Sequence, residues 1–195
     1  MNDKKLSYLK EHNIDIGYLE PIYTCDKCKD IGYVDGKKCS CYIRKEIELF
    51  DNISHFSKYI ENDNFSNMNI DYYNQGIMAI GNKRMYFDYM KDAIKHMKEK
   101  INNIDSEPYN AIFVGPTGTG KTYLSRCIGA ELIKKNKSVL YVNVNEYINS
   151  LKPDYEGVPL ENYAIICDMF IIDDLGTENS TDFSLTKLNY ISGSL

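Results

Sequence analysis

The chain has 195 residues, a length that suits one domain of ordinary size with a small additional segment. Hydrophobic residues make up 43% and charged residues 26%, which is typical of a globular protein and excludes a largely disordered chain. The net charge of −5, from 23 basic and 28 acidic residues, argues against a strongly basic nucleic-acid-binding protein. No apolar run approaches the roughly 20 residues that cross a bilayer, and residues 1–10 lack the apolar core of a secretory signal. We therefore expect a cytoplasmic protein without membrane association.

The first half of the chain contains short elements. Residues 1–20 are polar with scattered apolar positions, which indicates either a short helix or an irregular leader. The glycines at 32 and 36 predict a hairpin of residues 31–34 with 37–39. From residue 85 to 101, apolar side chains recur at helical spacing, which predicts an amphipathic helix whose methionines are core residues. The predicted segments are a leader over 1–22, a cysteine-rich segment over 23–45, a helical linker region over 46–108 and a final domain over 109–195.

From residue 110 onward, short apolar runs alternate with segments of helical spacing. This alternation predicts an α/β fold in which helices cover both faces of a parallel sheet. Asn145 is the predicted N-cap of one of these helices. The expected strands are residues 111–114, 139–144 and 169–172, and the expected helices are 122–135, 145–151 and 181–192.

A phosphate-binding motif follows the first of these strands and opens the next helix. Its glycines permit a tight turn in which backbone N–H groups, together with the helix N-terminus, can hold a polyphosphate. Lys121 would reach the β- and γ-phosphates of ATP, and the Thr122 hydroxyl would bind Mg²⁺. We predict nucleotide binding by this motif and by the adjacent Tyr123. The motif fits G-x-x-x-x-G-K-[ST] and reads Gly115-Pro116-Thr117-Gly118-Thr119-Gly120-Lys121-Thr122.

Two acidic residues follow the apolar run at 169–172. A buried strand here would carry Asp173 to the carboxyl edge of the sheet, beside the phosphate loop, where it could hold Mg²⁺ through water. Asp174 would orient or deprotonate the attacking water. Most ATPases with this arrangement have Glu at that position, and Asp reaches less far. We predict Lys121 and Asp174 as catalytic residues, and Thr122 and Asp173 as magnesium ligands.

Four of the six cysteines lie close together, in the order Cys25, Cys28, Cys39 and Cys41. Two close pairs of thiolates separated by a short loop suit tetrahedral Zn²⁺, and in an intracellular protein metal binding is favoured over disulfides. An iron–sulfur cluster and unmetallated thiols are the alternatives. Residues 25–45 also hold six basic and three acidic residues, which could contact a phosphate backbone or an acidic partner, or form a solvated surface. The two remaining cysteines, at 127 and 167, lie in apolar runs and are predicted to be core thiols.

The order of these motifs resembles that of the DnaC-type loaders of the bacterial and phage replicative helicase, which are AAA+ ATPases. The IstB transposition helpers share the ATPase part, and the cysteine segment favours the loaders. The resemblance covers residue 23 to the C-terminus. Besides the cysteines and the phosphate loop, it rests on Asn64-Phe65-Ser66-Asn67, on Asp71-Tyr72-Tyr73 and on Ile171-Ile172-Asp173-Asp174-Leu175-Gly176-Thr177-Glu178.

This resemblance implies a P-loop NTPase of the AAA+ (ASCE) type with a three-layer αβα core, preceded by a small zinc-binding knot. It also implies ATP, Mg²⁺ and Zn²⁺ as cofactors. The implied partners are a replicative helicase hexamer and single-stranded DNA, and the resemblance allows self-assembly through the ATPase core.

The chain departs from the family pattern at both ends. Only 24 residues precede Cys25 and 21 follow Asp174. In this family a further strand lies between the phosphate-loop strand and the Asp173 strand, and a γ-phosphate sensor and an arginine finger follow. Two more βα units need roughly 50–60 residues. We therefore expect a fragment that is incomplete at the C-terminus and also at the N-terminus. We expect its 111–114 and 169–172 strands to lack their shared neighbour, and we expect the chain to bind ATP with little hydrolysis.

The leading hypothesis is an ATP-dependent helicase loader of DNA replication, in which ATP binding and hydrolysis control its grip on the helicase or on DNA. An IstB-like transposition helper would use the same core. A zinc-bearing interaction module with an inactive nucleotide site is a third reading. A small-molecule kinase is disfavoured by the adjacent Asp pair and by the cysteine segment.

Overall fold

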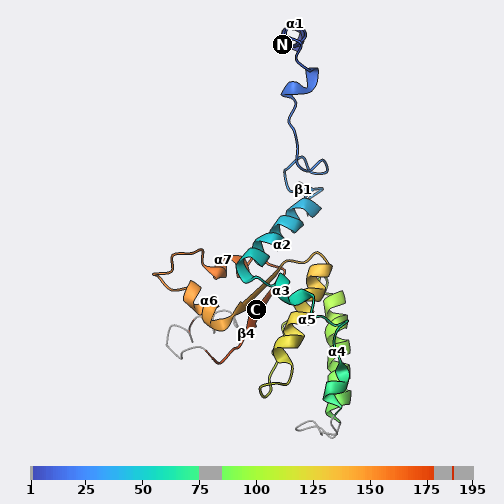
Figure 1. The fold of residues 1–195 in the computed structure, drawn as a ribbon, viewed down its shortest axis with the longest axis vertical. Coiled ribbons are helices and arrows are strands. Elements are labelled where there is room, and N and C mark those ends of the chain that lie inside the picture. Colours follow the sequence, from blue (N-terminus) through green and yellow to red (C-terminus); the bar gives the residue numbers. More distant parts are fainter. Residues whose placement is uncertain (1, 75–84, 178–185, 187–195) are drawn as a thin grey trace. The chain divides into compact units, whose positions relative to one another are not determined.

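The computed structural model describes residues 2–74, 85–177 and 186. The chain forms two compact units, Met1–Tyr42 and Ile43–Leu195, each with its own folded elements (Figure 1). The finer segment boundaries predicted from the sequence stay predictions.

The first unit contains two short helices and a hairpin. α1 spans Asn2–Glu11, and the 3₁₀ helix η1 spans Ile16–Leu19. The antiparallel strands β1, Tyr33–Val34, and β2, Lys37–Lys38, confirm the predicted hairpin. Asp35 and Gly36 between them have φ angles of 51° and 74°, the conformation that the tightest two-residue hairpin turn requires.

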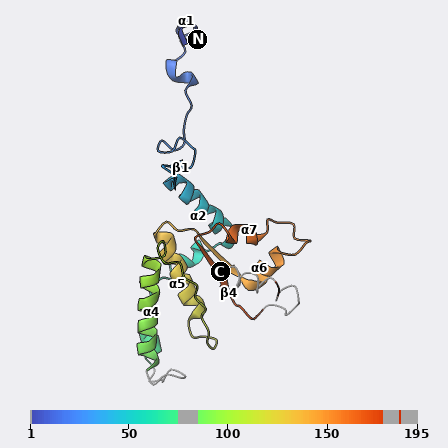
Figure 2. The ribbon, with the colours of Figure 1, turned by 180° about the vertical axis from the view of Figure 1, so that it is seen from behind.

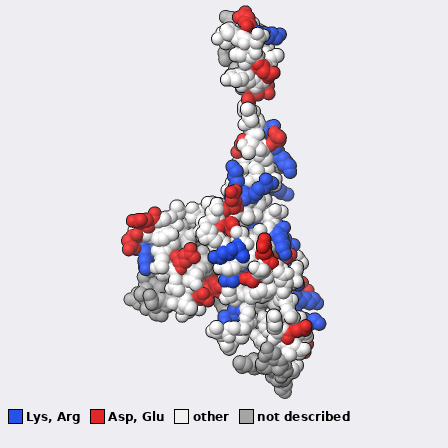
Figure 3. All heavy atoms as spheres, viewed as in Figure 1, with Lys and Arg blue, Asp and Glu red and all other residues white. Residues whose placement is uncertain are grey.

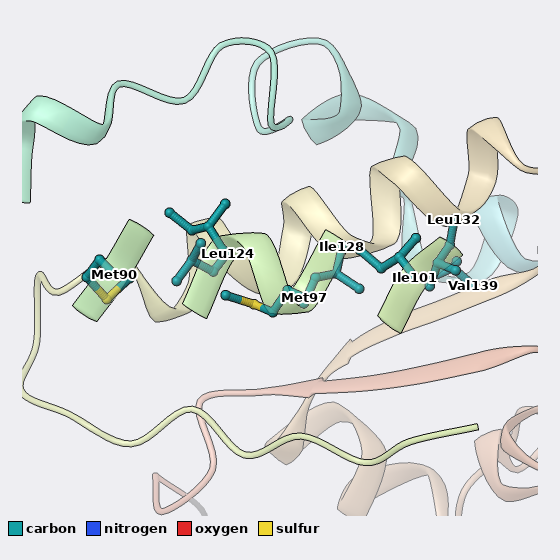
Figure 4. Packing of buried hydrophobic residues seen from close by; sticks show 8 residues of the cluster. Met90, Met97, Ile101, Leu124, Ile128, Leu132 and Val139 are labelled. Carbon is teal, nitrogen blue, oxygen red and sulfur yellow. The ribbon is translucent and has the colours of Figure 1, made fainter. Parts of the chain in front are cut away.

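The helices before the phosphate loop include the predicted amphipathic helix. α2 spans Ser40–Ser54, α3 spans Ser57–Ile60, η2 spans Ile70–Tyr73 and α4 spans Tyr86–Asn102. The inner face of α4 packs against α5, Lys121–Lys134, and Met90 and Met97 on that face are core residues, as predicted (Figure 4). The prediction is wrong for Met85, which is the N-cap residue before α4 and is exposed. This core contains Met90, Ile94, Met97, Ile101, Leu124, Ile128, Leu132 and Val139.

The second unit contains a two-stranded parallel sheet, and the carboxyl ends of its strands lie at the candidate site. β3 spans Val139–Asn143 and β4 spans Met169–Asp173, and the last residues of the two strands are paired. Successive side chains of β3 and β4 face opposite layers of helices. One layer is formed by α4 and α5, and the other by α6, Val144–Ser150, and α7, Leu160–Ala164. Figures 1 and 2 both show these helix pairs on opposite sides of the strands. The described part thus confirms a mixed α/β fold with parallel strands.

The predicted strand at 111–114 is wrong. These residues have no regular secondary structure, and the side chains of Ile112 and Val114 are 81% and 90% exposed. An extended segment becomes a strand only when its backbone groups pair with a neighbour. Among the described residues, no strand lies beside this segment. Its apolar pattern therefore predicts a buried strand that the structure does not contain.

Two smaller expectations also need revision, and a third is not tested. β4 is half-buried along its length instead of fully buried, because in the described residues it has a neighbour on one edge only. The N-cap of α6 is Asn143 and not Asn145, since the helix begins directly after β3 and the Asn143 side chain accepts the Asn145 backbone N–H. The helix predicted over 181–192 lies outside the described residues, apart from residue 186.

The described surface fits the sequence composition. None of the described helices is long and apolar enough to span a membrane. Basic and acidic side chains are interspersed over the visible face of each unit, in keeping with the small net charge (Figure 3).

Candidate functional site

The phosphate loop, residues 115–120, leads into the start of α5. Gly118 and Gly120 have φ angles of 80° and 88°, in the left-handed region that favours glycine. A Cβ on Gly120 would lie 2.4 Å from the hydroxyl oxygen of Tyr73, so a side chain there would displace Tyr73. The first N–H groups of an α-helix have no partner within the helix. The loop and the first turn of α5 therefore offer backbone donors to an anion.

Lys121 is folded back onto this loop. Its Nζ donates to the carbonyl oxygens of Gly115, at 2.8 Å, and Pro116, at 2.9 Å. The hydroxyl of Thr119 donates to the Pro116 carbonyl at 2.8 Å and closes the same turn. Hydrogen bonds between ionised partners are stronger than those to neutral acceptors. The ammonium group can therefore exchange these carbonyl oxygens for phosphate oxygens at the same loop.

The two halves of the predicted site meet at Thr122 and Asp173. Thr122 Oγ1, on α5, donates to Asp173 Oδ1, at the end of β4, over 3.0 Å. The backbone N–H of Asp174 donates to the same carboxylate oxygen, also at 3.0 Å. Because the Thr122 proton goes to Asp173, the lone pairs of Oγ1 stay available to a cation. Hydroxyl and carboxylate oxygens are the donors that Mg²⁺ prefers, so this donor set fits the ion.

The second oxygen of Asp173 has a different partner. The phenolic hydroxyl of Tyr141, on β3, donates to Asp173 Oδ2, and Arg126 Nε donates to the Tyr141 oxygen at 3.1 Å. Arg126 also forms an ion pair with Asp63, in which Nη1 and Oδ2 are 3.1 Å apart. Asp173 is therefore held from two sides, by α5 and by β3.

Asp174 is exposed and lies just beyond the end of β4. Its φ angle is 58°, an uncommon conformation for a residue with a side chain. Asn143 Nδ2, from the end of β3, donates to Asp174 Oδ2 at 2.9 Å. The carboxylate is thus fixed at the edge of the site, one residue from Asp173.

A cavity of about 590 Å³ opens beside the phosphate loop. The hydroxyl of Tyr73 donates to the Thr119 carbonyl at 3.3 Å, and that of Tyr123 donates to the Asn64 carbonyl at 3.2 Å. Burial raises the pKa of both phenols, that of Tyr123 to about 12, so both stay neutral. Aromatic rings with a few amide groups suit a flat heteroaromatic ligand. The lining residues are Asn62, Asn67, Met68, Asn69, Tyr72, Tyr73, Tyr86, Gly118, Thr119, Gly120 and Tyr123.

The four clustered cysteines converge in the first unit. Their sulfur atoms all lie within 4.8 Å of one another, with 3.8 Å between Cys25 and Cys39 and 3.4 Å between Cys28 and Cys41. A tetrahedral ion with bonds of about 2.3 Å places its sulfur ligands roughly 3.8 Å apart, so this spacing fits Zn²⁺. The Asp30 carboxylate accepts the backbone N–H groups of Thr24 and Cys25, each at 2.9 Å, and fixes the first cysteine loop.

The thiol pKa values differ within the cysteine cluster and are raised at both cysteines outside it. In the cluster, the backbone N–H of Cys28 lowers the pKa of the Cys25 thiol to about 6, whereas hydrogen bonding with the Cys28 side chain raises that of Cys41 to about 12. Outside it, burial raises the pKa of Cys127 to about 12 and that of Cys167 to about 11. Cys127 is fully buried and Cys167 packs against the α6 core, so both are the core thiols that were predicted.

Comparison with known proteins identifies the family. The family described as "IstB-like ATP binding protein" matches residues 86–188, a range that includes the phosphate loop and Asp173. The chain belongs to this family. It is 32% identical over 108 residues to the chromosomal replication initiator protein DnaA of Campylobacter jejuni, covering 53% of the chain and 23% of that protein. It is 24% identical over 115 residues to the replicative helicase loader DnaC of Escherichia coli, covering 56% of the chain and 47% of that protein.

These matches confirm the predicted resemblance to the DnaC-type and IstB-like ATPases. The chain spans less than half the length of either relative. No solved structure gives a significant match. The cysteine cluster precedes the residues that the family matches, so its interpretation depends on its own geometry.

Three residues of the site were not predicted. Tyr141 and Asn143 belong to the segment 139–144, which was predicted as a strand from its apolar pattern alone, and Arg126 lies in the predicted helix 122–135 without a predicted role. The available signal was positional: Asn143 ends the strand paired with β4, so it reaches the same sheet edge as Asp173. Tyr72 and Tyr73 belonged to the family resemblance, but nothing in their spacing indicated a cavity at the loop.

Proposed function

We propose that the protein binds ATP with Mg²⁺ at the phosphate loop. The observation that carries this proposal is the hydrogen bond between Thr122 and Asp173, which joins two sequence motifs at one point. The backbone of the loop and Lys121 hold the β- and γ-phosphates, Thr122 and Asp173 hold the ion, and Asp174 orients water. Bound Mg²⁺ would neutralise charge on the phosphates. The adenine base lies in the 590 Å³ cavity, against Tyr73.

We infer that the cysteine cluster holds one structural Zn²⁺. Among the described residues of the first unit, Leu9, Cys28 and Cys39 are the buried hydrophobic side chains, which is a small core for a folded segment. Segments of this kind commonly depend on a bound metal for their fold. The sulfur spacing supports zinc as that metal.

We further propose that the protein acts in DNA replication as an ATP-dependent loader of the replicative helicase. ATP binding would control its grip on the helicase hexamer and on single-stranded DNA, and copies would assemble through the ATPase core. The likeness to DnaC and to DnaA supports a replication role. The cysteine segment before the ATPase part supports the loader over other members of the family.

A transposition helper of the IstB type is the second candidate, because the matched family is described as IstB-like and the sequence also resembles the IstB helpers. A loading assay separates the two. The purified chain, the replicative helicase of the same genome and circular single-stranded DNA are mixed with and without ATP, and the helicase retained on DNA is measured by gel filtration.

We expect ATP to increase the retained helicase, Lys121→Ala to abolish that increase, and Lys91→Ala, at an exposed position on α4, to leave it unchanged. If the chain binds ATP but captures a transposase of the same genome and not the helicase, the transposition helper is the correct assignment.

A further inference from the structure

Tyr141 connects an arginine to the Asp173 carboxylate. Its oxygen accepts a hydrogen bond from Arg126 Nε on α5, and its proton goes to Asp173 Oδ2 at the end of β4. The other carboxylate oxygen accepts from Thr122 and from the Asp174 backbone. Both oxygens of Asp173 therefore have protein donors, and the donor from Tyr141 lies outside every motif recognised in the sequence.

The direction of these hydrogen bonds follows from the chemistry of the three groups. A guanidinium only donates, an ionised carboxylate only accepts, and a phenol has a single proton. Because Arg126 uses a lone pair of the Tyr141 oxygen, the Tyr141 proton points to Asp173. Each bond in such a chain polarises the next and strengthens it.

Neither Tyr141 nor Arg126 is free to move. The Tyr141 side chain is 7% exposed, and its ring stacks on Phe56 with centroids 5.1 Å apart. The Arg126 guanidinium lies 3.7 Å from the centroid of the Tyr59 ring and is paired with Asp63. A stacked phenol and a guanidinium held on two sides give Asp173 a donor in one fixed direction.

Water can reach the hydrogen bond between Tyr141 and Asp173. A polar cavity of about 260 Å³ is lined in part by Arg126, Tyr141, Asp173 and Asp174. If the Tyr141 hydroxyl were removed, water could take its place at Asp173 Oδ2 but would not hold the carboxylate in one orientation. The hydroxyl thus fixes the rotation of the carboxylate about its Cβ–Cγ bond and keeps Oδ1 toward Thr122.

We propose that Tyr141 is a positioning residue for the Mg²⁺ site and that Arg126 acts through it. The inference rests on the proposed ATP–Mg²⁺ site. Loss of a group that orients a metal ligand commonly weakens metal binding about 10–100-fold. Tyr141 contacts only one of the two proposed ligands, Asp173, and leaves Thr122 in place, so we expect the lower end of that range.

The test is a magnesium titration of nucleotide binding by the full chain, followed with a fluorescent ADP analogue. Tyr141→Phe keeps the ring and its stacking and removes only the hydroxyl. We expect its nucleotide affinity in EDTA to equal that of the wild type. The Mg²⁺ concentration that produces half of the increase in nucleotide affinity should rise about tenfold. Tyr163→Phe, at a half-buried ring on α7, is the matched control and should leave the titration unchanged.

Arg126→Lys supplies an independent variant, since it keeps the charge and removes the Nε donor. It should shift the titration in the same direction, and the double variant should be no worse than Tyr141→Phe alone, because Arg126 acts through Tyr141. An unshifted titration in Tyr141→Phe, with a normal thermal unfolding curve, overturns the proposal. Additive effects in the double variant overturn the role of Arg126. Failure of the wild type to bind nucleotide in either buffer rejects the proposed function itself.

Discussion

Asn143, at the end of β3, holds Asp174, just past the end of β4, through a hydrogen bond of 2.9 Å from Nδ2 to Oδ2. The same side chain caps α6, because its Oδ1 accepts the backbone N–H of Asn145 at 2.9 Å. The φ angle of Asp174 lies in the left-handed region, which aspartate adopts more often than most other residues with a side chain. The Asn143 amide group therefore connects Asp174, the residue proposed to orient water, to the start of α6.

Asn143→Ala should destabilise the second unit by about 1 kcal/mol, the usual effect of losing an N-cap. Asn145→Ala is the matched comparison, since the Asn145 side chain donates to the Thr177 hydroxyl at 3.1 Å, at an exposed position, and does not cap the helix. Urea unfolding followed by circular dichroism measures both. A larger loss of stability in Asn145→Ala would show that the cap is at the residue that the sequence indicated.

Lys121→Ala should weaken ATP binding tenfold or more, a loss of about 1.4 kcal/mol, because it removes a phosphate-facing charge and leaves the backbone donors of the loop. Isothermal titration with ATP and Mg²⁺ measures the affinity, and Lys91→Ala on the surface of α4 is the control. An unchanged affinity in Lys121→Ala would remove the phosphate loop from the proposed site.

Asp173→Asn should preserve nucleotide binding in EDTA and reduce the gain in affinity that Mg²⁺ produces. The reason is that an amide is a poorer ligand for a hard cation than a carboxylate, while the phosphate donors are untouched. The ratio of the two dissociation constants, with and without Mg²⁺, is the measurement. Asp154→Asn, at an exposed position, should leave this ratio at the wild-type value.

The cysteine cluster should hold one Zn²⁺ per chain. Structural zinc commonly contributes on the order of 10 kcal/mol to a small site, so chelation or Cys25→Ser should unfold the hairpin and its cysteine loops and leave the second unit folded. Elemental analysis and limited proteolysis report the two effects, and Cys167→Ser should retain the metal. Protein that contains iron, or no metal, would contradict the assignment.

ATP hydrolysis by this chain should be slow. An arginine beside the γ-phosphate can contribute 10³–10⁵ in rate. Arg126, the described arginine next to Asp173, is engaged by Asp63 and Tyr141. A phosphate-release assay should therefore give turnover well below about 1 s⁻¹. Steady turnover near that rate, abolished by Lys121→Ala, would mean that the described residues suffice for catalysis.

The parts of the structure that were predictable from sequence depend on local patterns. The spacing of Met90, Ile94, Met97 and Ile101 specifies the buried face of α4, and the pair Asp35 and Gly36 specifies the hairpin turn. The phosphate loop requires a fixed set of residue types at fixed spacing, and its partner Asp173 follows an apolar run. These features could therefore be located before any contact was known.

The remaining features depend on contacts between distant residues. The apolar pattern at 111–114 does not reveal whether a neighbouring strand exists. The role of Tyr141 depends on Arg126, 15 residues away, and on Asp173, 32 residues away. Tyr73 approaches Thr119 from a segment 46 residues earlier in the chain. Spacing within one helix or strand contains no information about such pairs.

The one-sided pairing of β4 has a consequence for hydrogen exchange. In a parallel ladder, alternate backbone N–H groups of a strand point to opposite neighbours. Within the described residues β4 pairs only with β3, so alternate amide protons of Met169–Asp173 lie outside this ladder. Those amides should exchange rapidly with deuterated solvent while their neighbours in sequence are protected. The strand that ends at Asp173 is thus secured along one edge by backbone hydrogen bonds, and at its tip by the hydroxyl groups of Thr122 and Tyr141.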